Sequence, residues 1–292
     1  MKYFMCCLFC LAFMYASAQE DMSVHFKIYD TRNKEITTID KIVSAMENAD
    51  VLFFGEEHND SAGHFLENKI FQALYERYRS NLVLSMEMFE KDNQLVLNEY
   101  LNRQIDETRL GKDARLWPNY KDYRPMVEFA KENYIPVIAA NTPRRYVSLV
   151  TKKGMRSLDS LSKEAKMLLP PLPYDTLSGK YHEKFIDIMQ GSPGAGSGNI
   201  YYSQSLWDAG MSYSIYQFLK KNKGKKVFHC VGKFHCDEKL GTAAQLLMRN
   251  KKLAILNISC FPDKSFANPD WSGFDTLGDF VILTDPDLKK TF

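Results

Sequence analysis

The 292-residue chain carries 38 basic and 36 acidic residues, a formal net charge of +2. Nucleic-acid binding needs a clustered excess of cations, so this balance predicts no nucleic-acid partner. A hydrophobic content of 45% over this length is enough to bury a large core, in one large domain or two small ones. Three of the six cysteines precede residue 11, and the odd number that remains is unlike a disulfide scaffold.

The first residues have the order of a secretory signal peptide. Lys2 precedes an apolar run from Tyr3 to Tyr15, and small residues follow at 16–18. The run is shorter than the roughly 20 apolar residues that a spanning helix needs. We therefore expect residues 1–18 to be a signal peptide and residues 19–292 to form one domain exported to the periplasm or cell envelope. Two alternatives stay open: an uncleaved anchor, and a lipid anchor at Cys10 that would associate the protein with a membrane.

Short apolar runs alternate with amphipathic stretches along the rest of the chain. Such alternation predicts an α/β fold, with a mostly parallel sheet flanked by helices. The expected strands are residues 51–54, 82–86, 135–139, 226–231 and 253–258. The expected helices are residues 61–79, 94–103, 144–152 and 242–250.

Two segments interrupt this alternation. Residues 155–190 have helical patterns broken by a proline-rich run at 169–173, which predicts a helical insertion or cap. Residues 191–198 consist almost wholly of glycine and serine with one proline, so we expect a flexible loop inside one domain. A plain linker is the favoured interpretation of this loop. A lid or anion-binding loop is the alternative, although no Lys-Ser/Thr pair of a phosphate-binding loop follows.

Polar residues follow the apolar runs at the expected strand ends, where ligands gather in an open parallel sheet. Two strands run into the pattern Gly-x-x-His, which places His58 and His235 at such ends. Glu56 and Glu87 also end buried runs, and a carboxylate there costs several kcal/mol unless it is paired or solvated in a cleft. Two histidines and a carboxylate can hold a divalent metal or transfer protons near neutral pH. The alternative for each histidine is a satisfied structural residue.

Two further features are candidates for a binding site. Arg144 follows the third strand end, where it would either clamp a carboxylate ligand or lie on the surface. Gln204, Trp207 and Asp208 share one face of an expected helix with Met211. Such a mixed polar and aromatic face is typical of a site wall, but a buried hydrogen-bonded network gives the same pattern.

The ordered set of motifs resembles the ChaN-like haem-binding family, within a wider group that includes the Tiki proteases, the TraB proteins and the erythromycin esterases. The resemblance spans roughly residues 40–260, and it rests on the following segments: 51–58, 86–90, 141–143, the Gln204-x-x-Trp207-Asp208-x-x-Met211 helix and Gly232-x-x-His235. It implies a parallel-sheet α/β fold. For the ChaN branch, it implies haem binding associated with iron acquisition, with haem held between the subunits of a homodimer.

A haem ligand would be held without a covalent bond, because the sequence contains no Cys-x-x-Cys-His. Tyr201 and Tyr202 begin a helix directly after the glycine-rich loop, and phenolate is a hard anionic ligand that suits ferric iron. We therefore take these two tyrosines as candidate axial ligands. The other residues expected to contact the cofactor are Arg144, Gln204, Trp207 and Asp208.

The Tiki branch implies a different function, metal-dependent peptide hydrolysis. His58, Glu87 and His235 match the paired Gly-x-x-His motifs and the glutamate of that branch. As an enzyme, the chain would use these three residues and Glu56 around a metal-bound water, or as general acid and base. We expect a haem-binding protein, with this metal-dependent hydrolase as the alternative.

Overall fold

A computed structural model describes residues 21–190 and 198–292 of the chain. The expected signal peptide at residues 1–18, with Cys10, and residues 191–197 of the glycine-rich stretch lie outside the described residues. Gly198, the last residue of that stretch, begins a helix. No helix within the described ranges is both long enough and apolar enough to cross a membrane.

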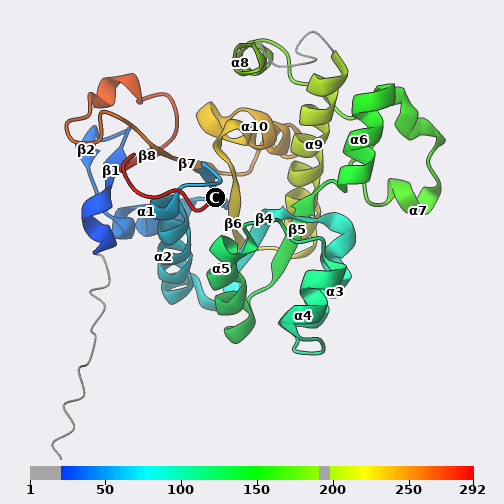
Figure 1. Cartoon of the computed structure of the whole chain (residues 1–292), viewed down its shortest axis with the longest axis horizontal. Helices are drawn as coiled ribbons and strands as arrows, with labels where there is room; N and C mark the ends of the chain where they lie inside the picture. The colour runs from blue at the N-terminus through cyan, green and yellow to red at the C-terminus, as the bar shows by residue number, and fades with distance from the viewer. Residues whose placement is uncertain (1–20, 191–197) are drawn as a thin grey trace, which may run out of the picture.

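One eight-stranded sheet organises the structure, in the order β2-β1-β8-β7-β3-β6-β4-β5 (Figure 1). The strands are β1 Phe26–Asp30, β2 Glu35–Ile36, β3 Val51–Glu56, β4 Leu82–Glu90, β5 Val137–Asn141, β6 Lys226–Gly232, β7 Ile255–Pro262 and β8 Phe280–Thr284. Neighbouring strands from β8 through to β5 are parallel, whereas β1 pairs antiparallel with β8 and with β2. The expected α/β fold with a mostly parallel sheet is therefore confirmed.

Helices cover both faces of this sheet. They are α1 Ile39–Ala45, α2 Ser61–Tyr78, α3 Gln94–Leu101, α4 Glu107–Asp113, α5 Tyr120–Glu132, α6 Arg144–Lys153, α7 Lys163–Lys166, α8 Lys180–Met189, α9 Gly198–Lys221 and α10 Gly241–Arg249. Figure 1 shows α2 and α5 on one side of the sheet and α9 and α10 on the other. Strands buried on both faces read as continuous apolar runs, which explains the sequence of β3.

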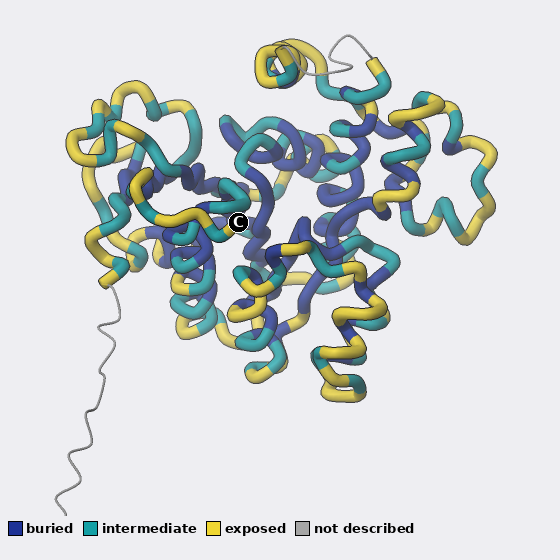
Figure 2. The backbone as a smooth tube through the Cα atoms, viewed as in Figure 1, coloured by how far each residue is buried: buried dark blue, intermediate teal, exposed yellow. Residues whose placement is uncertain are grey.

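The two faces of β3 contribute to two separate cores, because successive side chains of a strand point to opposite sides. Leu52 and Phe54 join the larger core beneath α1, α2 and α5. Val51 and Phe53 join the smaller core with Met211 of α9. The tube coloured by burial shows the strands as a dark interior, with exposed segments on the outer helices (Figure 2). The sheet is thus held rigidly from both sides up to the ends of its strands.

The segment at residues 155–190, where we expect a helical insertion, contains a 3-10 helix at Met155–Ser160, α7 and α8. The proline-rich run at 169–173 lies between α7 and α8 and has no regular structure. Three apolar side chains of α8 line a cleft at the strand ends: Phe185, Ile188 and Met189.

Candidate functional site

The two Gly-x-x-His motifs meet at the carboxyl ends of β3 and β6. Glu56 ends β3 directly beside Gly232, which ends β6. A Cβ built on Gly232 would lie 3.0 Å from His58 Nε2 and 3.6 Å from Glu87 Oε2, so both side chains reach over this glycine. His235 Nε2 lies 3.7 Å from Glu87 Oε1. The structure therefore brings together the three residues that the sequence placed at strand ends.

The first imidazole is paired with Glu56. His58 Nδ1 lies 2.7 Å from Glu56 Oε1, and the same oxygen accepts a 2.8 Å hydrogen bond from the Tyr123 hydroxyl. Burial raises the pKa of Glu56 to about 8, and the nearby Glu67 carboxylate contributes to that rise. Burial alone would lower the pKa of His58, but Glu56 and Glu87 outweigh it and raise that pKa to about 9. This pair therefore holds its protons more tightly than free side chains do.

The second imidazole is paired with Asp208 on α9. His235 Nδ1 lies 2.7 Å from Asp208 Oδ1. Asp208 is fully buried and also accepts hydrogen bonds from Thr242 Oγ1 at 2.8 Å and from the Tyr181 hydroxyl at 2.5 Å. Burial opposes charging of His235, yet Asp208 and Glu87 raise the pKa of this histidine overall. A fixed partner at Nδ1 orients the ring and leaves Nε2 directed toward Glu87.

Glu87 stands between the two imidazoles as a charged group. Burial favours its neutral form, but His235 and His58, together with a 2.8 Å hydrogen bond from the Gly232 backbone N–H, lower its pKa overall. Two imidazoles that share one carboxylate, each with its own second carboxylate, can donate and accept protons at neighbouring points. This arrangement of groups can therefore carry out acid–base chemistry on a bound ligand.

The imidazoles of His58 and His235 both line a cleft of about 310 Å³. Its apolar wall comes from α8 and from Phe234, and Lys184 and Lys233 add cationic groups. The Nζ of Lys184 is buried and forms no hydrogen bond with the described residues. Its nearest carboxylate oxygens belong to Asp237, at 3.6 Å, and Glu238, at 3.9 Å. The cleft thus offers an apolar surface beside an ammonium group whose hydrogen-bonding capacity is unused.

The predicted site residues on α9 differ in their position relative to the cleft. Gln204 lines the cleft, and its side-chain nitrogen lies 3.2 Å from His235 Nδ1. Trp207 packs against two cores, with its ring 6.5 Å from the ring of His235. Tyr201 is buried, and its hydroxyl donates to the Leu177 carbonyl. Burial raises the pKa of Tyr201 to about 12, which disfavours the phenolate form in this conformation.

Tyr202 is 36% exposed and lies at the same end of α9. Its ring is 3.9 Å from the point where a Cβ on Gly198 would stand. Tyr202 does not line the cleft around His58. Of the two candidate tyrosines, this is the one whose side chain reaches solvent.

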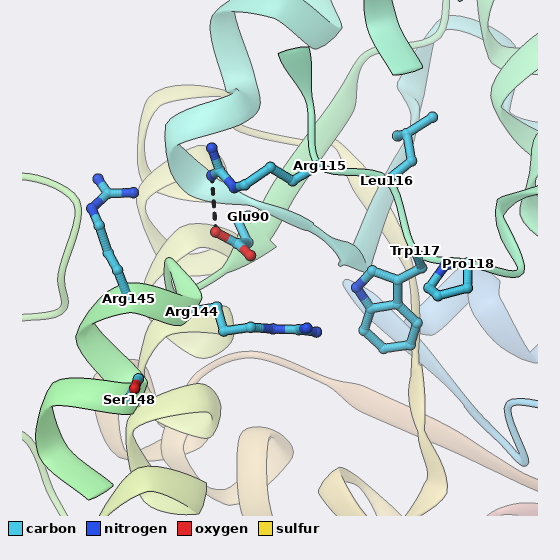
Figure 3. Close-up of a pocket in the computed structure, with 8 residues that line it drawn as sticks. All are labelled: Glu90, Arg115, Leu116, Trp117, Pro118, Arg144, Arg145 and Ser148. Atoms are coloured by element: carbon cyan, nitrogen blue, oxygen red, sulfur yellow. Dashed lines mark hydrogen bonds and ion pairs between the residues drawn. The ribbon is translucent and has the colours of Figure 1, made fainter. Parts of the chain in front are cut away.

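Arg144 lies outside the cleft, in a neighbouring cavity of about 420 Å³ at the ends of β4 and β5. Figure 3 shows its guanidinium extended across this cavity toward Trp117, while Arg115 pairs with Glu90. Among the described residues, Arg144 has no hydrogen-bond or ion-pair partner. The ring of Trp117 packs edge-on against His58 at 5.1 Å, so this cavity adjoins the first imidazole pair.

A third group of polar side chains lies behind Glu56, and two of its members, His64 and Glu67, are not among the site residues predicted from the sequence. His64 Nδ1 is 3.2 Å from Glu56 Oε2 and 3.2 Å from Glu67 Oε2, and all three side chains are buried. Within the described ranges, this is the set of three possible ligands whose donor atoms all lie within 4.8 Å of one another. The predicted metal set of His58, Glu87 and His235 is not drawn together to that degree. A His-x-x-Glu spacing on one helix face was the signal available in the sequence.

These features define an α/β protein with paired imidazoles and carboxylates at the carboxyl ends of a parallel sheet. The family described as haem-binding uptake, Tiki superfamily, ChaN matches residues 42–246, and the chain belongs to this family. The resemblance seen in the sequence motifs is therefore confirmed.

The fold is similar to that of ChaN of Campylobacter jejuni, a structure described as showing cofacial haem binding. The TM-score is 0.66 at 16% identity, over 89% of this chain and 97% of that chain. An erythromycin esterase in an open conformation is similar at a TM-score of 0.49 and 11% identity, over 89% of this chain and 83% of that chain.

A curated relative, the chloroplastic protein RETICULATA-RELATED 5 of Arabidopsis thaliana, is 28% identical over 139 residues. The matched region is 45% of this chain, and it spans 19% of the length of that relative.

Proposed function

We propose that the protein binds haem without a covalent link in the cleft at the ends of β3 and β6, as part of haem and iron acquisition in a bacterial envelope. Membership of a haem-binding family is the observation that carries this proposal. The chemistry of the cleft supports it, because haem is a flat, largely apolar ligand with two carboxylate groups. Small-molecule sites typically pair an apolar lining with a few convergent polar groups.

The described residues fit such a ligand. Phe185, Ile188 and Phe234 supply apolar contact surface at the cleft. Lys184 supplies a buried ammonium group without a hydrogen-bond partner among the described residues, and a propionate would satisfy it. Arg144, which has no hydrogen-bond or ion-pair partner among the described residues, is a second cation near the strand ends, in the adjoining cavity. Apolar burial should supply most of the affinity, and the cations should set the orientation.

Two side chains are proposed iron ligands. Tyr202 is the exposed member of the predicted tyrosine pair, and its phenolate would suit ferric iron. Because Tyr202 lies outside the cleft, it would bind the iron only of a haem that projects beyond the cleft. His58 lines the cleft and has Nδ1 held by Glu56, which leaves Nε2 toward the cleft. A carboxylate on the far nitrogen is the usual support for a metal-binding histidine. Tyr201 would have to give up its hydrogen bond to Leu177 before it could bind iron.

A homodimer that encloses the haem is part of the proposal. The cleft of about 310 Å³ is at the lower end of the range for small-molecule sites, so a haem seated there would project beyond it. Ile188 is 62% exposed at the rim, where a second subunit would cover it. Export through the segment at residues 1–18, with or without a lipid anchor at Cys10, completes the proposed role.

Hemin titration of the mature protein tests this function. We expect a saturable shift of the Soret band at micromolar hemin. His58→Ala and Tyr202→Phe should alter the spectrum of the complex more than its affinity, with Tyr134→Phe, an exposed tyrosine, as the control. Sedimentation should show a haem-dependent increase in mass. Absence of a saturable shift in the wild type would end the haem proposal, and unchanged spectra in both variants would remove only the ligand assignment.

A hydrolase is the second proposed function, favoured by the two carboxylate-supported imidazoles that face Glu87. In this reaction, one imidazole would take a proton from an attacking water while the other protonates the leaving group. A peptidase and esterase screen of the wild type against the double variant His58→Ala, His235→Ala tests it. Equal activity in both proteins would leave the hydrolase without support.

A further inference from the structure

The cluster behind the first imidazole pair has the geometry of a metal site. His64 Nδ1 is 3.2 Å from one carboxylate oxygen of Glu56 and 3.2 Å from one of Glu67. Ligand atoms at about 2.0–2.2 Å from a tetrahedral zinc ion lie roughly 3.3 Å from one another, so these spacings need little adjustment. His64 and Glu67 are one turn apart on α2, and Glu56 reaches them from the end of β3.

A hydrogen bond at His64 Nε2 orients this imidazole so that its Nδ1 can bind a metal ion. His64 Nε2 lies 3.1 Å from the His58 carbonyl oxygen, which also accepts a 3.0 Å hydrogen bond from the Asn119 side chain. An N–H donated from Nε2 to this carbonyl leaves the lone pair on Nδ1, directed at the two carboxylates. Metal-binding histidines are commonly held by such a bond from the other ring nitrogen to a backbone carbonyl.

Two buried carboxylate oxygens without a hydrogen-bond partner among the described residues point to a cation as their ligand. Glu56 Oε1 is satisfied by His58 and Tyr123, whereas Glu56 Oε2, which faces His64, has no hydrogen-bond partner among the described residues. Glu67 Oε1 is equally without one, and both carboxylates are wholly buried. Asp122 adds a third acidic group, with its Oδ2 4.0 Å from His64 Nε2. Even together, the imidazoles of His58 and His64 do not balance three acidic groups, and buried charges need a counter-ion.

We propose that Glu56, His64 and Glu67 bind one divalent transition-metal ion in a closed site behind the cleft, which shares Glu56 with it. One imidazole nitrogen and carboxylate oxygens suit Zn²⁺ or Mn²⁺ better than Ca²⁺, which prefers oxygen ligands alone. Glu67 has both oxygens available, so it can bind through two and give the ion four donor atoms. The ring of Tyr123, edge-on to His64 at 4.9 Å, shields one side. Through Glu56, the ion fixes the position of His58.

Metal binding to the haem-free mature protein tests this proposal. After treatment with a chelator, the wild type should take up one equivalent of Zn²⁺ or Mn²⁺ in equilibrium dialysis and should gain thermal stability. Substitution with Co²⁺ should produce visible d–d bands characteristic of low-coordinate nitrogen and oxygen ligation. A wild type that binds none of these ions stoichiometrically overturns the proposal.

Variants locate the ion. Glu67→Gln should weaken binding at least tenfold, whereas Glu76→Gln, at an exposed position of the same helix, should bind as the wild type does. His235→Gln should also leave the affinity unchanged, because His235 belongs to the cleft. Loss of the ion in His235→Gln with retention in Glu67→Gln would assign it to the cleft instead. If circular dichroism shows Glu67→Gln unfolded, His64→Gln replaces it with the same expected loss, and unchanged binding overturns the proposal.

Discussion

The two imidazole pairs flank the same glycine but lie in different surroundings. The His235 side chain is 9% exposed, and its partner Asp208 accepts three hydrogen bonds. The His58 side chain is 37% exposed and faces the cleft, while its partner Glu56 belongs to a deeper carboxylate cluster. The His235–Asp208 pair is built as a fixed support, and the His58–Glu56 pair presents a face to ligands. The difference predicts that changes in the His235 pair reduce stability, whereas changes in the His58 pair alter the bound ligand and its spectrum.

Removal of the Asp208 carboxylate should have the largest effect on stability. Asp208→Ala leaves three buried donors, on His235, Thr242 and Tyr181, without their acceptor. Loss of one partner of a buried charged network typically costs about 3–5 kcal/mol, and we expect a loss of that size in urea denaturation at neutral pH. Glu57→Ala, at a 45% exposed side chain, is the control. A cost below about 1 kcal/mol would contradict the supporting role of this pair.

A third imidazole, that of His229 on β6, shows how burial changes the pKa of a histidine that lacks a carboxylate partner. His229 is fully buried beside Ser85 and has no carboxylate in hydrogen-bonding contact among the described residues, and burial lowers its pKa to about 4. Between pH 6.5 and 4 the unfolded chain therefore binds a proton that the folded protein does not, so stability falls as pH decreases through this window. The shift corresponds to about 3 kcal/mol.

The measurement is the difference in unfolding free energy between the wild type and His229→Gln from pH 7 to pH 4. The wild type should lose about 3 kcal/mol relative to the variant, because glutamine keeps a side-chain hydrogen bond to Ser85 but does not titrate in this range. His182→Gln, at an exposed histidine on α8, should follow the wild type at every pH. Parallel curves for the wild type and His229→Gln would contradict the assignment.

The sequence predicted the strand-end residues but not their partners. Glu56, His58, Glu87 and His235 are recognisable because each directly follows a buried apolar run. His64 and Glu67 resemble ordinary polar residues of an amphipathic helix, and only the packing of α2 against β3 brings them to Glu56. The His-x-x-Glu spacing is the only local trace of this pair, and it does not indicate that Glu56 approaches through tertiary contact.

The same reason explains what the fold prediction missed. The five adjacent strands β7, β3, β6, β4 and β5 are visible as apolar runs, whereas β1 pairs with β8 from the opposite end of the chain. Their sequences are short, and nothing local indicates an antiparallel addition to a parallel sheet. Tyr201 is a comparable case in the site, since its bond to the Leu177 carbonyl depends on a loop that no periodicity describes.

Gly232, which lies between the two imidazole pairs, should tolerate few substitutions. A Cβ at Gly232 would stand 3.0 Å from His58 Nε2 and 3.1 Å from its Cε1, so Gly232→Ala must displace the exposed imidazole. We expect a destabilisation of about 1–3 kcal/mol, typical of overpacking, together with a changed spectrum of bound hemin. Gly111→Ala, in a helix with free space around the new methyl group, should be neutral or slightly stabilising. Unchanged hemin spectra in Gly232→Ala would show that bound hemin does not contact His58.

The smallest expected effect is on hemin binding alone, and it concerns a lysine in the cleft beside the His58 pair. Lys184 and Lys180 are one turn apart on α8, but only Lys184 lines the cleft, whereas Lys180 pairs with Glu238. Lys184→Met keeps the apolar stem and removes the ammonium group, and Asp237 retains Lys233 at 3.8 Å. Stability should therefore change by less than about 1 kcal/mol. Because the Lys184 ammonium already lies 3.6 Å from Asp237, an ion pair with a propionate should add little, and its loss should weaken hemin binding roughly two- to tenfold, measured by titration at low ionic strength. Because added salt screens such a pair, the difference should shrink as ionic strength rises. Lys180→Met should bind hemin as the wild type does, and equal affinities for all three proteins would place the propionates elsewhere.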